Sequence, residues 1–395
     1  MAYLVILGGN EMACPAIQRF MDLGHAVLVV DGNPDAPARA LADVFVCSNF
    51  SDIKATEAAL AEFEISGIMP INDFGVRTAA YVASQRGLPG NTVQAALAAT
   101  NKRVMRESWA LAGLPQPRFT ACSVGSILSG NMPDWSDFPC IVKPTYSGGG
   151  SRAVVLANNR EEIVSHVRET QSEYLDQEVI IEEFIQGTEH TIEVLFWPAG
   201  MKLLSISDKE NYPGNVAVVQ NLYFPGPIGH RFRDQIEQLV YSACRALNFR
   251  IGAAHFEVLI RDGRVYLLEV GGRPGGGLNL HPICELSTGY DYAGLYAAVL
   301  NGQPPDFSRK KSVHLAWHYF PAGDGRVLLA IEGLDVVAGT PNVVDFKVYE
   351  AIGKPRFKLR NDLARPGYIL VQSDSHEAAR DRASDLVSQV EFKTA

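Results

Sequence analysis

The chain has 395 residues, of which 47% are hydrophobic and 20% are charged, and its net charge at pH 7 is −9. This composition is typical of a soluble globular protein, and the length indicates two or three domains. Thirty-five Lys and Arg against 44 Asp and Glu leave no basic stripe that could neutralise a run of phosphates, which argues against a nucleic-acid partner.

The N-terminus reads as a first strand, because it lacks the basic segment and the long apolar core of a signal peptide. No run of about 18 apolar residues follows, so we expect no membrane partner. The six cysteines are scattered singly, without the short spacings of a zinc or redox motif. We therefore expect reduced thiols and a cytoplasmic location.

The first hundred residues alternate short apolar runs with helix-like stretches, which predicts a doubly wound α/β domain over 1–98. Gly8, Gly9 and Asn10 follow the first run and Asp31 ends the second, which matches part of a dinucleotide fingerprint. Because the full G-x-G-x-x-G pattern is absent, we favour a structural turn. The apolar runs are 4–7, 26–30, 44–46 and 67–71, and the helical stretches are 13–23 and 53–63.

A second domain is predicted over 99–305, beginning where Thr100 or Asn101 can cap a helix that runs to about residue 112. Gly113, Pro115 and Pro117 then stop that helix. The rest of this domain alternates strands and helices in an α+β pattern. The predicted strands are 140–143, 179–183, 191–196, 253–260 and 265–270, and the predicted helices are 160–173 and 232–246.

Gly302, Pro304 and Pro305 mark a second boundary, so a third domain is predicted over 306–395. It contains predicted strands near 313–319 and 368–372 and a closing helix from about 375 to 390.

A strand that ends in Lys143 and runs into a glycine loop is the first candidate for chemistry. Glycines let backbone N–H groups approach anionic oxygens, and the ammonium adds charge, so a phosphate site has this form. It is not the G-x-x-x-x-G-K-[ST] loop, because the lysine precedes the glycines. Taken alone, a surface hairpin tip explains it equally well. The loop consists of Ser147, Gly148, Gly149, Gly150 and Ser151.

The second candidate is an apolar strand that runs into acidic residues and a glycine turn. Its carboxylates could accept hydrogen bonds from the exocyclic amine of a purine or from ribose hydroxyls. An exposed acidic strand end is the simpler explanation if this segment is taken in isolation. The segment contains Glu182, Glu183, Phe184, Ile185 and Glu189.

The third candidate is a β-hairpin that carries Glu257 on one strand and Glu269 on the other, two carboxylates suited to Mg²⁺. A two-residue Asp-Gly turn would pair Glu257 with Leu268 and leave the carboxylates on opposite faces. A three-residue loop with a left-handed Gly263 would pair Glu257 with Leu267 and bring both to one face. We therefore predict the three-residue loop. A hairpin with one exposed acid at each end is the alternative.

Arg273 follows the second carboxylate among glycines, where it could stabilise negative charge on a phosphoryl or acyl oxygen. On its own this segment could be a loop with an ion-paired arginine. The residues after it are Pro274, Gly275, Gly276, Gly277, Leu278, Asn279, Leu280, His281 and Pro282.

The order of these signals resembles the ATP-grasp superfamily over the whole chain. The resemblance implies a pre-ATP-grasp α/β domain, a two-lobed ATP-grasp domain whose lid lobe covers about 115–185, and a C-terminal α+β domain similar to that of L-amino-acid ligases of the dipeptide-synthetase type. The family uses ATP and one or two Mg²⁺ ions, with Mn²⁺ as a substitute.

The resemblance also implies residue roles around the nucleotide. In this family two lysines hold the phosphates, a glycine loop closes over them, the hinge takes the adenine and a carboxylate binds the ribose. These roles fall on Lys102 and Lys143, on Ser147, Gly148, Gly149, Gly150 and Ser151, on Glu182, Glu183, Phe184 and Ile185, and on Glu189.

For the metal the resemblance implies Glu257 and Glu269, and for stabilising the acyl phosphate it implies Arg273, with Lys143 as a second catalytic residue. Many family members carry Asn two residues after the second metal Glu, where this chain has Gly271, so the third oxygen ligand is water or absent. The Gly-Gly-Gly run before His281 favours the amino-acid-ligase branch, in which this segment contacts a substrate carboxylate.

The expected activity is that of an ATP-dependent carboxylate–amine ligase that makes an amide or dipeptide through an acyl phosphate. We expect the lid to close and the glycine loop to order when nucleotide binds. A bicarbonate-using enzyme of the biotin-carboxylase kind is the first alternative, and a nucleotide-binding protein without turnover is the second.

The substrates are a small carboxylic acid or amino acid plus an amine, and the sequence identifies neither. Residues that select them are expected between about 207 and 230 and after Arg273, although a plain surface loop explains the first stretch equally well. The candidates are Lys209, His230, Gly275, Gly276, Gly277 and His281. A homodimer is expected because it is the commonest closed assembly.

Overall fold

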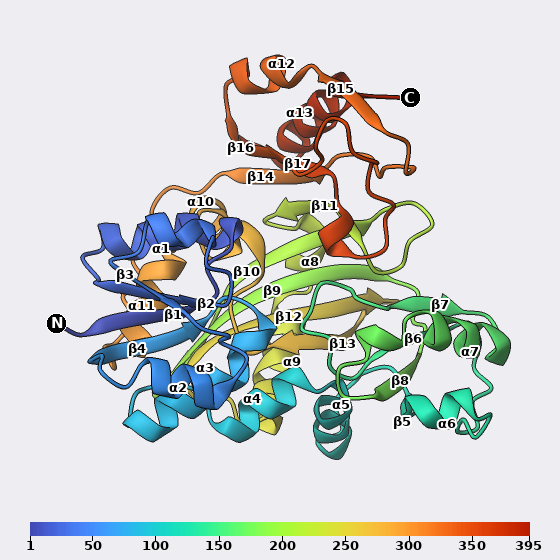
Figure 1. Cartoon of the computed structure of the whole chain (residues 1–395), viewed down its shortest axis with the longest axis horizontal. Helices are drawn as coiled ribbons and strands as arrows, with labels where there is room; N and C mark the ends of the chain where they lie inside the picture. The colour runs from blue at the N-terminus through green and yellow to red at the C-terminus, as the bar shows by residue number, and fades with distance from the viewer.

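A four-stranded parallel sheet forms the N-terminal part of the computed structural model, which describes residues 1–395 (Figure 1, blue). Its strand order is β3-β2-β1-β4, and the first strand is fully buried from Leu4 to Leu7. This confirms the parallel α/β unit. The elements are β1 (Tyr3–Leu7), α1 (Cys14–Asp22), β2 (Val27–Asp31), β3 (Val44–Cys47), α2 (Ile53–Ala59), β4 (Ile65–Pro70), α3 (Asp73–Arg86) and α4 (Val93–Thr100).

The glycine turn after β1 is structural, as expected. The backbone N–H of Gly9 donates to Asp31 Oδ2 at 2.7 Å, so this carboxylate is used within the turn. Gly8 has φ +104, a conformation that side chains rarely adopt.

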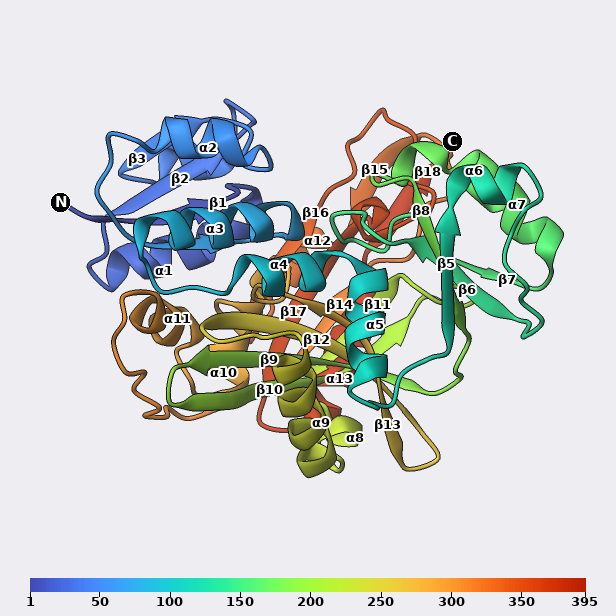
Figure 2. The same cartoon turned by 90° about the horizontal axis from the view of Figure 1, so that it is seen from below.

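A second sheet, antiparallel and ordered β5-β8-β6-β7, belongs to the lobe expected to act as a lid, is called the lid sheet below, and lies on the opposite side of the molecule from the N-terminal sheet (Figures 1 and 2). Helix α5 leads into it and begins where the Asn101 side chain accepts a hydrogen bond from the N–H of Val104 at 3.0 Å. The elements are α5 (Lys102–Leu111), β5 (Phe119–Ser123), α6 (Val124–Leu128), β6 (Cys140–Pro144), β7 (Val155–Ala157), α7 (Arg160–Glu169) and β8 (Glu178–Glu183).

The largest sheet has eight strands in the order β13-β12-β9-β10-β11-β14-β17-β16. One face of it buries Ile192, Phe256 and Val258 against Ile236 and Val240 of α9. The strands and helices of its first half are β9 (Thr188–Trp197), β10 (Gly200–Asn211), β11 (Val219–Phe224), α8 (Pro227–His230), α9 (Arg233–Ala246), β12 (Gly252–Arg261), β13 (Arg264–Gly271), α10 (Ile283–Thr288) and α11 (Tyr292–Leu300).

The last ninety residues extend this same sheet, because β14 pairs with β11 in the register Asn221 to His318. The sheet is therefore continuous across the predicted boundary at residue 305. Its C-terminal half is covered by α13, whose Ala379, Ala383 and Leu386 pack on the strands. The elements are β14 (His314–Tyr319), β15 (Leu328–Glu332), α12 (Leu334–Gly339), β16 (Val343–Val348), β17 (Gly367–Ser373), α13 (His376–Gln389) and β18 (Glu391–Thr394).

Substrate-selecting residues were expected over about 207–230. Strands β10 and β11 and helix α8 cover 207–211, 219–224 and 227–230, so the alternative of a plain surface loop is wrong for these parts. Polar residues are buried in β10 because they find partners across the sheet. Ser207 Oγ lies 2.5 Å from Thr191 Oγ1, and Asp208 Oδ1 lies 2.8 Å from His190 Nδ1. These buried pairs hide the apolar alternation by which a strand is recognised.

The prediction of a three-residue loop in the β12–β13 hairpin is wrong. Arg261 pairs with Arg264, and the two turn residues Asp262 and Gly263 have φ +51 and +76. Asp-Gly suits this two-residue turn, which needs a positive φ at both positions. The carboxylates nevertheless share one face, because the register shifts further along the hairpin: Val258 pairs with Leu267, whereas Glu257 pairs with Glu269.

Candidate active site

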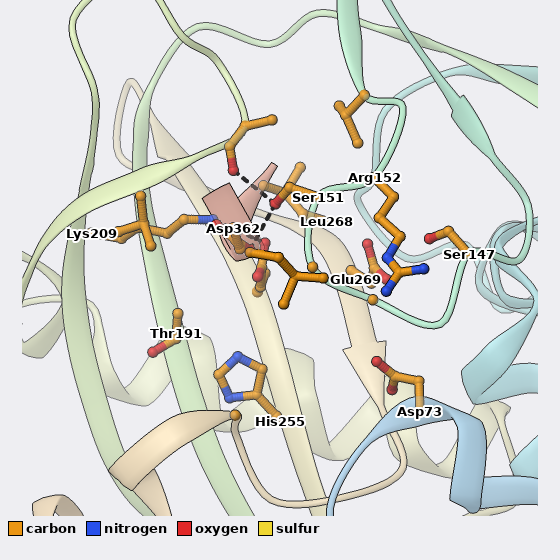
Figure 3. A pocket seen from close by; sticks show the side chains of 18 of the residues that line it. Asp73, Ser147, Ser151, Arg152, Thr191, Lys209, His255, Leu268, Glu269 and Asp362 are labelled. Carbon is orange, nitrogen blue, oxygen red and sulfur yellow. Dashed lines mark hydrogen bonds and ion pairs between the residues drawn. The ribbon is translucent and has the colours of Figure 1, made fainter. Parts of the chain in front are cut away.

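A cavity of about 810 Å³ lies between the lid sheet and the large sheet, with further walls from the N-terminal and C-terminal parts of the chain (Figure 3). All the residues expected to bind the nucleotide and the metal line it, together with Arg273 and three of the substrate candidates. They are Lys102, Lys143, Ser147, Gly148, Gly149, Gly150, Ser151, Glu182, Glu183, Phe184, Ile185, Glu189, Lys209, Glu257, Glu269, Arg273, Gly276 and Gly277.

Three substrate candidates lie outside the cavity wall. His230 is exposed at the end of α8, on the face of the sheet that packs against α9. His281 pairs through Nδ1 with Glu285 Oε2 at 3.4 Å. Gly275 is buried, and its N–H donates to Glu193 Oε2 at 3.0 Å. His230 and His281 were chosen for residue type within a polar segment, which does not indicate which way a side chain points.

Glu257 and Glu269 lie directly opposite each other across β12 and β13. The extra residue on β13 is Leu268, which forms a β-bulge and restores the shared face that the tight turn alone would remove. Two carboxylates beside a cavity suit Mg²⁺, which binds few protein oxygens and completes its coordination with phosphates and water. No group of three or more His, Cys, Asp or Glu side chains converges anywhere in the chain, so Glu257 and Glu269 would hold a metal as a pair.

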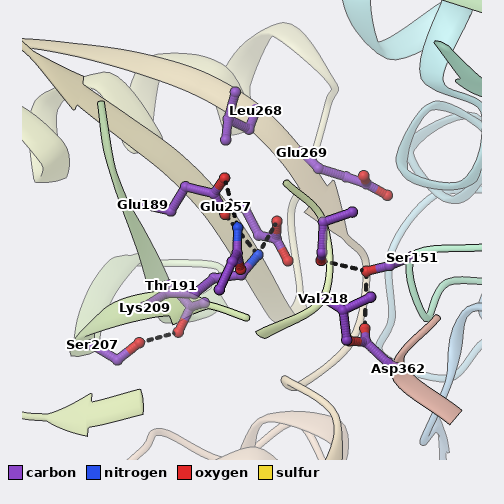
Figure 4. A network of polar contacts seen from close by, with 12 residues as sticks. Ser151, Glu189, Thr191, Ser207, Lys209, Val218, Glu257, Leu268, Glu269 and Asp362 are labelled. Atoms are coloured by element: carbon purple, nitrogen blue, oxygen red, sulfur yellow. Dashed lines mark hydrogen bonds and ion pairs between the residues drawn. The ribbon is translucent and has the colours of Figure 1, made fainter. Parts of the chain in front are cut away.

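Each of these carboxylates is ion-paired with a lysine. Lys209 Nζ lies 2.9 Å from Glu189 Oε2 and 3.2 Å from Glu257 Oε2, as Figure 4 shows, and Lys102 Nζ lies 2.9 Å from Glu269 Oε1. Burial alone would raise the pKa of Glu257, but the Lys209 ammonium outweighs it and lowers that pKa to about 2. Glu257 is therefore ionised, and the site already accommodates the positive charge of Lys209. Lys209 belongs to this charge network and is not free to bind a substrate by itself.

Lys143 Nζ pairs with Glu182 Oε2 at 2.8 Å, and Arg106 Nε pairs with the other oxygen, Oε1, at 2.7 Å. Burial acts to raise the pKa of Glu182, yet the two cations lower it to about 2. Each oxygen of Glu182 is therefore ion-paired within the protein, and a contact of this carboxylate with adenine stays a prediction. Arg106 itself was missed, although its position four residues after Lys102 places both on one face of α5.

The glycine loop is docked against three other parts of the chain. Residues 148–151 all have positive φ, and a Cβ atom on Gly148 would lie 2.0 Å from the Phe74 ring. Ser151 Oγ lies 2.9 Å from the carbonyl of Ala217 and 3.0 Å from Asp362 Oδ2, so its one proton is shared between these two acceptors. The N–H of Asp362 donates in turn to the Gly150 carbonyl at 3.1 Å. The loop therefore lines the cavity and is held there by contacts with Phe74, Ala217 and Asp362.

Arg273 is held by the N-terminal part of the chain, because its Nη2 donates to Asp73 Oδ2 at 2.7 Å. Its Nε is buried and makes no hydrogen bond. A Cβ atom on Gly271 would lie 3.1 Å from Asp73 Oδ1 and 3.3 Å from Arg273 Cζ. Asp73 and Arg273 thus fill the space that a side chain at Gly271 would need.

A buried carboxylate also orients a histidine at the cavity wall. Glu193 Oε1 lies 2.6 Å from His255 Nδ1, and its Oε2 accepts from Tyr292 Oη at 3.2 Å. Sequence reasoning missed all three residues; the only signal was the alternation that puts His255 on the same face of β12 as Glu257.

At the end of the cavity beside Gly277, the wall is formed by apolar side chains from both the N-terminal and the C-terminal parts of the chain. A Cβ atom on Gly277 would lie 2.6 Å from the Trp317 ring and 3.0 Å from Met12 Cε. Tyr319, whose ring stacks on Trp317, carries the Arg365 guanidinium 3.9 Å above its centroid. This end is therefore narrow beside the glycine segment.

Sequence comparisons agree with this arrangement. Residues 136–281 match the sequence model of the ATP-grasp domain, and residues 318–395 match that of L-amino acid ligase C-terminal domain 2. A D-alanine–D-alanine ligase of Paracidovorax citrulli is 31% identical over 247 residues, which cover 59% of this chain and 71% of the relative. The chain belongs to the ATP-grasp superfamily. As a member of that superfamily it is an ATP-binding enzyme of the carboxylate–amine ligase class.

Solved structures share the ATP-grasp fold over the full length of the chain. The L-amino acid ligase from Bacillus licheniformis has a TM-score of 0.84 at 24% identity, covering 100% of this chain and 99% of that one. The phosphoribosylglycinamide synthetase from Anaerococcus prevotii has a TM-score of 0.76 at 19% identity, with both chains fully covered. The predicted fold class is confirmed. No helix of this ATP-grasp chain has the length and apolar character needed to span a membrane.

Proposed function

We propose that this ATP-grasp protein joins a small carboxylic acid or amino acid to an amine, forming an amide or dipeptide through an acyl phosphate and releasing ADP and phosphate. The observation that carries the proposal is that Glu257 and Glu269 face each other in the cavity that also holds Lys102, Lys143 and Arg273. This set can neutralise a triphosphate and a developing oxyanion at once.

In this proposal Lys102, Lys143 and the glycine loop bind the phosphates, and the backbone of residues 183–185 receives the adenine. Glu257 and Glu269 would hold Mg²⁺ or Mn²⁺, which neutralises phosphate charge when bound. Lys102 Nζ lies 2.9 Å from Glu269 Oε1, and in this proposal it turns from that carboxylate toward a phosphate oxygen when nucleotide binds.

The proposed chemistry has two steps. A carboxylate oxygen of the acid attacks the γ-phosphorus, a P–O bond forms, and the bond to the ADP oxygen breaks. The amine nitrogen then attacks the acyl carbon, inorganic phosphate leaves with the bonding electron pair, and the nitrogen loses a proton. Arg273 stabilises the negative charge on the acyl phosphate and on the tetrahedral species. The docked glycine loop keeps water away from the acyl phosphate.

For the acid we propose a position between Arg273 and the Gly276–Gly277 segment, so that its side chain meets Met12 and Trp317. Because the Trp317 ring leaves too little space beside Gly277 even for a Cβ atom, an acid with a small side chain fits this position best.

The test measures phosphate and ADP release from Mg-ATP against a matrix of small acids and amines, with and without bicarbonate, and product masses. Release that requires one acid and one amine, with a product equal to their sum minus water, supports the proposal. Release that requires bicarbonate alone would transfer the protein to a carboxylating activity. An ATP-induced thermal shift without phosphate release under any mixture would indicate a nucleotide-binding protein without turnover.

A further inference from the structure

The β-bulge at Leu268 determines whether Glu257 and Glu269 can act together. If the pairing of β12 and β13 continued regularly from the Asp262–Gly263 turn, Leu268 would lie opposite Glu257. Glu269 would then point to the other face of the sheet. The observed register reaches Glu269 instead, and the shift occurs between Glu257 and Val258. A bulge of this kind needs partners for the backbone groups that leave the ladder.

Those partners come from outside the sheet, since β13 is its first strand and has no neighbour on the other side. The N–H of Leu267 donates to the carbonyl of Pro115 at 3.0 Å. Arg106 Nη1 donates to the carbonyl of Leu267 at 3.1 Å, and Arg106 Nη2 donates to that of Leu268 at 2.7 Å. One guanidinium therefore binds both carbonyls of the bulge.

The charge of Arg106 is almost completely buried, at 1% side-chain exposure, and Glu182 balances it. Glu182 also pairs with Lys143, the lysine of the lid that is proposed to bind phosphate. Arg106 therefore helps to position Lys143 through Glu182. Lys102, one turn earlier on α5, pairs with Glu269 itself. One face of α5 thus contacts the bulge, the second carboxylate and the lid strand. The planar fork of arginine can make these contacts simultaneously, whereas an ammonium cannot.

We propose that Arg106 is a positioning residue that holds the β13 bulge and thereby keeps Glu269 opposite Glu257 for metal binding. The inference rests on the proposed function, because it takes these two carboxylates as the metal ligands. Arg106 touches neither metal nor substrate in this role and acts through the backbone of Leu267 and Leu268.

The experiment measures Mn²⁺ affinity in the presence of saturating ADP, from the electron paramagnetic resonance signal of free Mn²⁺. For Arg106→Lys we expect binding about 10–100-fold weaker than in the wild-type protein, the range found when a residue that orients a metal ligand is removed. The matched control is Arg103→Lys on the exposed side of the same helix, where the ion pairs with Glu107 and Glu178 are at the surface. Its Mn²⁺ affinity should stay within about twofold.

Thermal unfolding of each variant separates loss of the fold from loss of the metal site. If Arg106→Lys does not fold, Gln116→Leu replaces it, because Gln116 Nε2 donates to the backbone carbonyl of Arg106 at 2.8 Å. Loss of that hydrogen bond should weaken Mn²⁺ binding by about threefold. Wild-type affinity in folded Arg106→Lys would overturn this inference and leave the proposed function intact. A wild-type protein that binds no Mn²⁺ with ADP would overturn both.

Discussion

Ser151 Oγ and Asp362 Oδ2 form a 3.0 Å hydrogen bond that joins the glycine loop of the lid to a residue 211 positions later in the chain. The C-terminal part of the protein therefore helps to hold the loop over the cavity.

Replacing Asp362 by Ala should release the loop and raise the KM for ATP. A hydrogen bond to a charged group contributes about 1.5 kcal/mol, which corresponds to about a tenfold rise. Steady-state ADP release measures it. Asp374→Ala, an exposed carboxylate in the same part of the chain, is the control and should leave KM unchanged. Equal KM values in both variants would show that the contact does not hold the loop.

Gly148→Ala should displace the glycine loop, because the added Cβ would lie 2.0 Å from Phe74 and the residue has φ +71. Gly150→Ala is matched in backbone strain, with φ +77, but its Cβ would meet nothing within 4 Å. We expect ATP affinity, measured by calorimetry, to fall more in Gly148→Ala than in Gly150→Ala. The reverse order would argue against docking on Phe74.

Arg273→Gln should lower kcat by about a hundredfold, because removing one donor from a developing oxyanion has an effect of that size. The KM for ATP should change little, since the proposed role begins after nucleotide binding. Single-turnover ADP release and product formation separate the two steps. A wild-type kcat in this variant would show that Arg273 does not stabilise charge in the rate-limiting step.

Stability should fall in acid because of Glu182, whose pKa is lowered to about 2 from an ordinary value of 4.5. A carboxylate with a lowered pKa in the folded state stabilises the fold above its ordinary pKa, and this contribution is lost as the pH falls from about 4.5 toward 2. Urea unfolding from pH 7 to pH 3 measures it. Glu182→Gln should be less stable at pH 7 yet lose less of its free energy of unfolding over this interval. Parallel curves for the two proteins would contradict the assignment.

Met12→Ala should widen the cavity beside Gly277 and shift acid preference toward larger side chains. One methylene in a substrate pocket changes kcat/KM by about tenfold or more, so the ratio of a larger to a smaller acid should rise at least that much. Competition between two acids, read by product mass, measures the ratio. An unchanged ratio would show that the side chain of the acid does not bind beside Met12.

The sequence was sufficient to predict the elements in which buried apolar residues recur at regular intervals, such as β1, β12 and α9. It was insufficient for β10, where Ser207 and Asp208 are buried with polar partners from β9. Strand periodicity measures burial of apolar side chains and cannot register burial that is balanced by hydrogen bonds.

Most cavity residues could be predicted because lysine, glycine and glutamate motifs occur in a recognisable order. Arg106 could not, since its role depends on a bulge in a strand about 160 residues later in the chain. The hairpin shows the same limit: Asp262 and Gly263 predict the turn, but the register of Glu269 is decided by contacts outside the hairpin.

The continuity of the eight-stranded sheet bears on how such proteins can be shortened or recombined. Separating the chain at residue 305 would strip β14 from β11 and leave an open edge of unpaired N–H and C=O groups along Asn221 to Phe224. Open edges of this kind promote aggregation. A chimera that exchanges the C-terminal ninety residues with those of another ligase must therefore preserve the β11–β14 register as well as the linker, because the new β14 has to complete the ladder on β11.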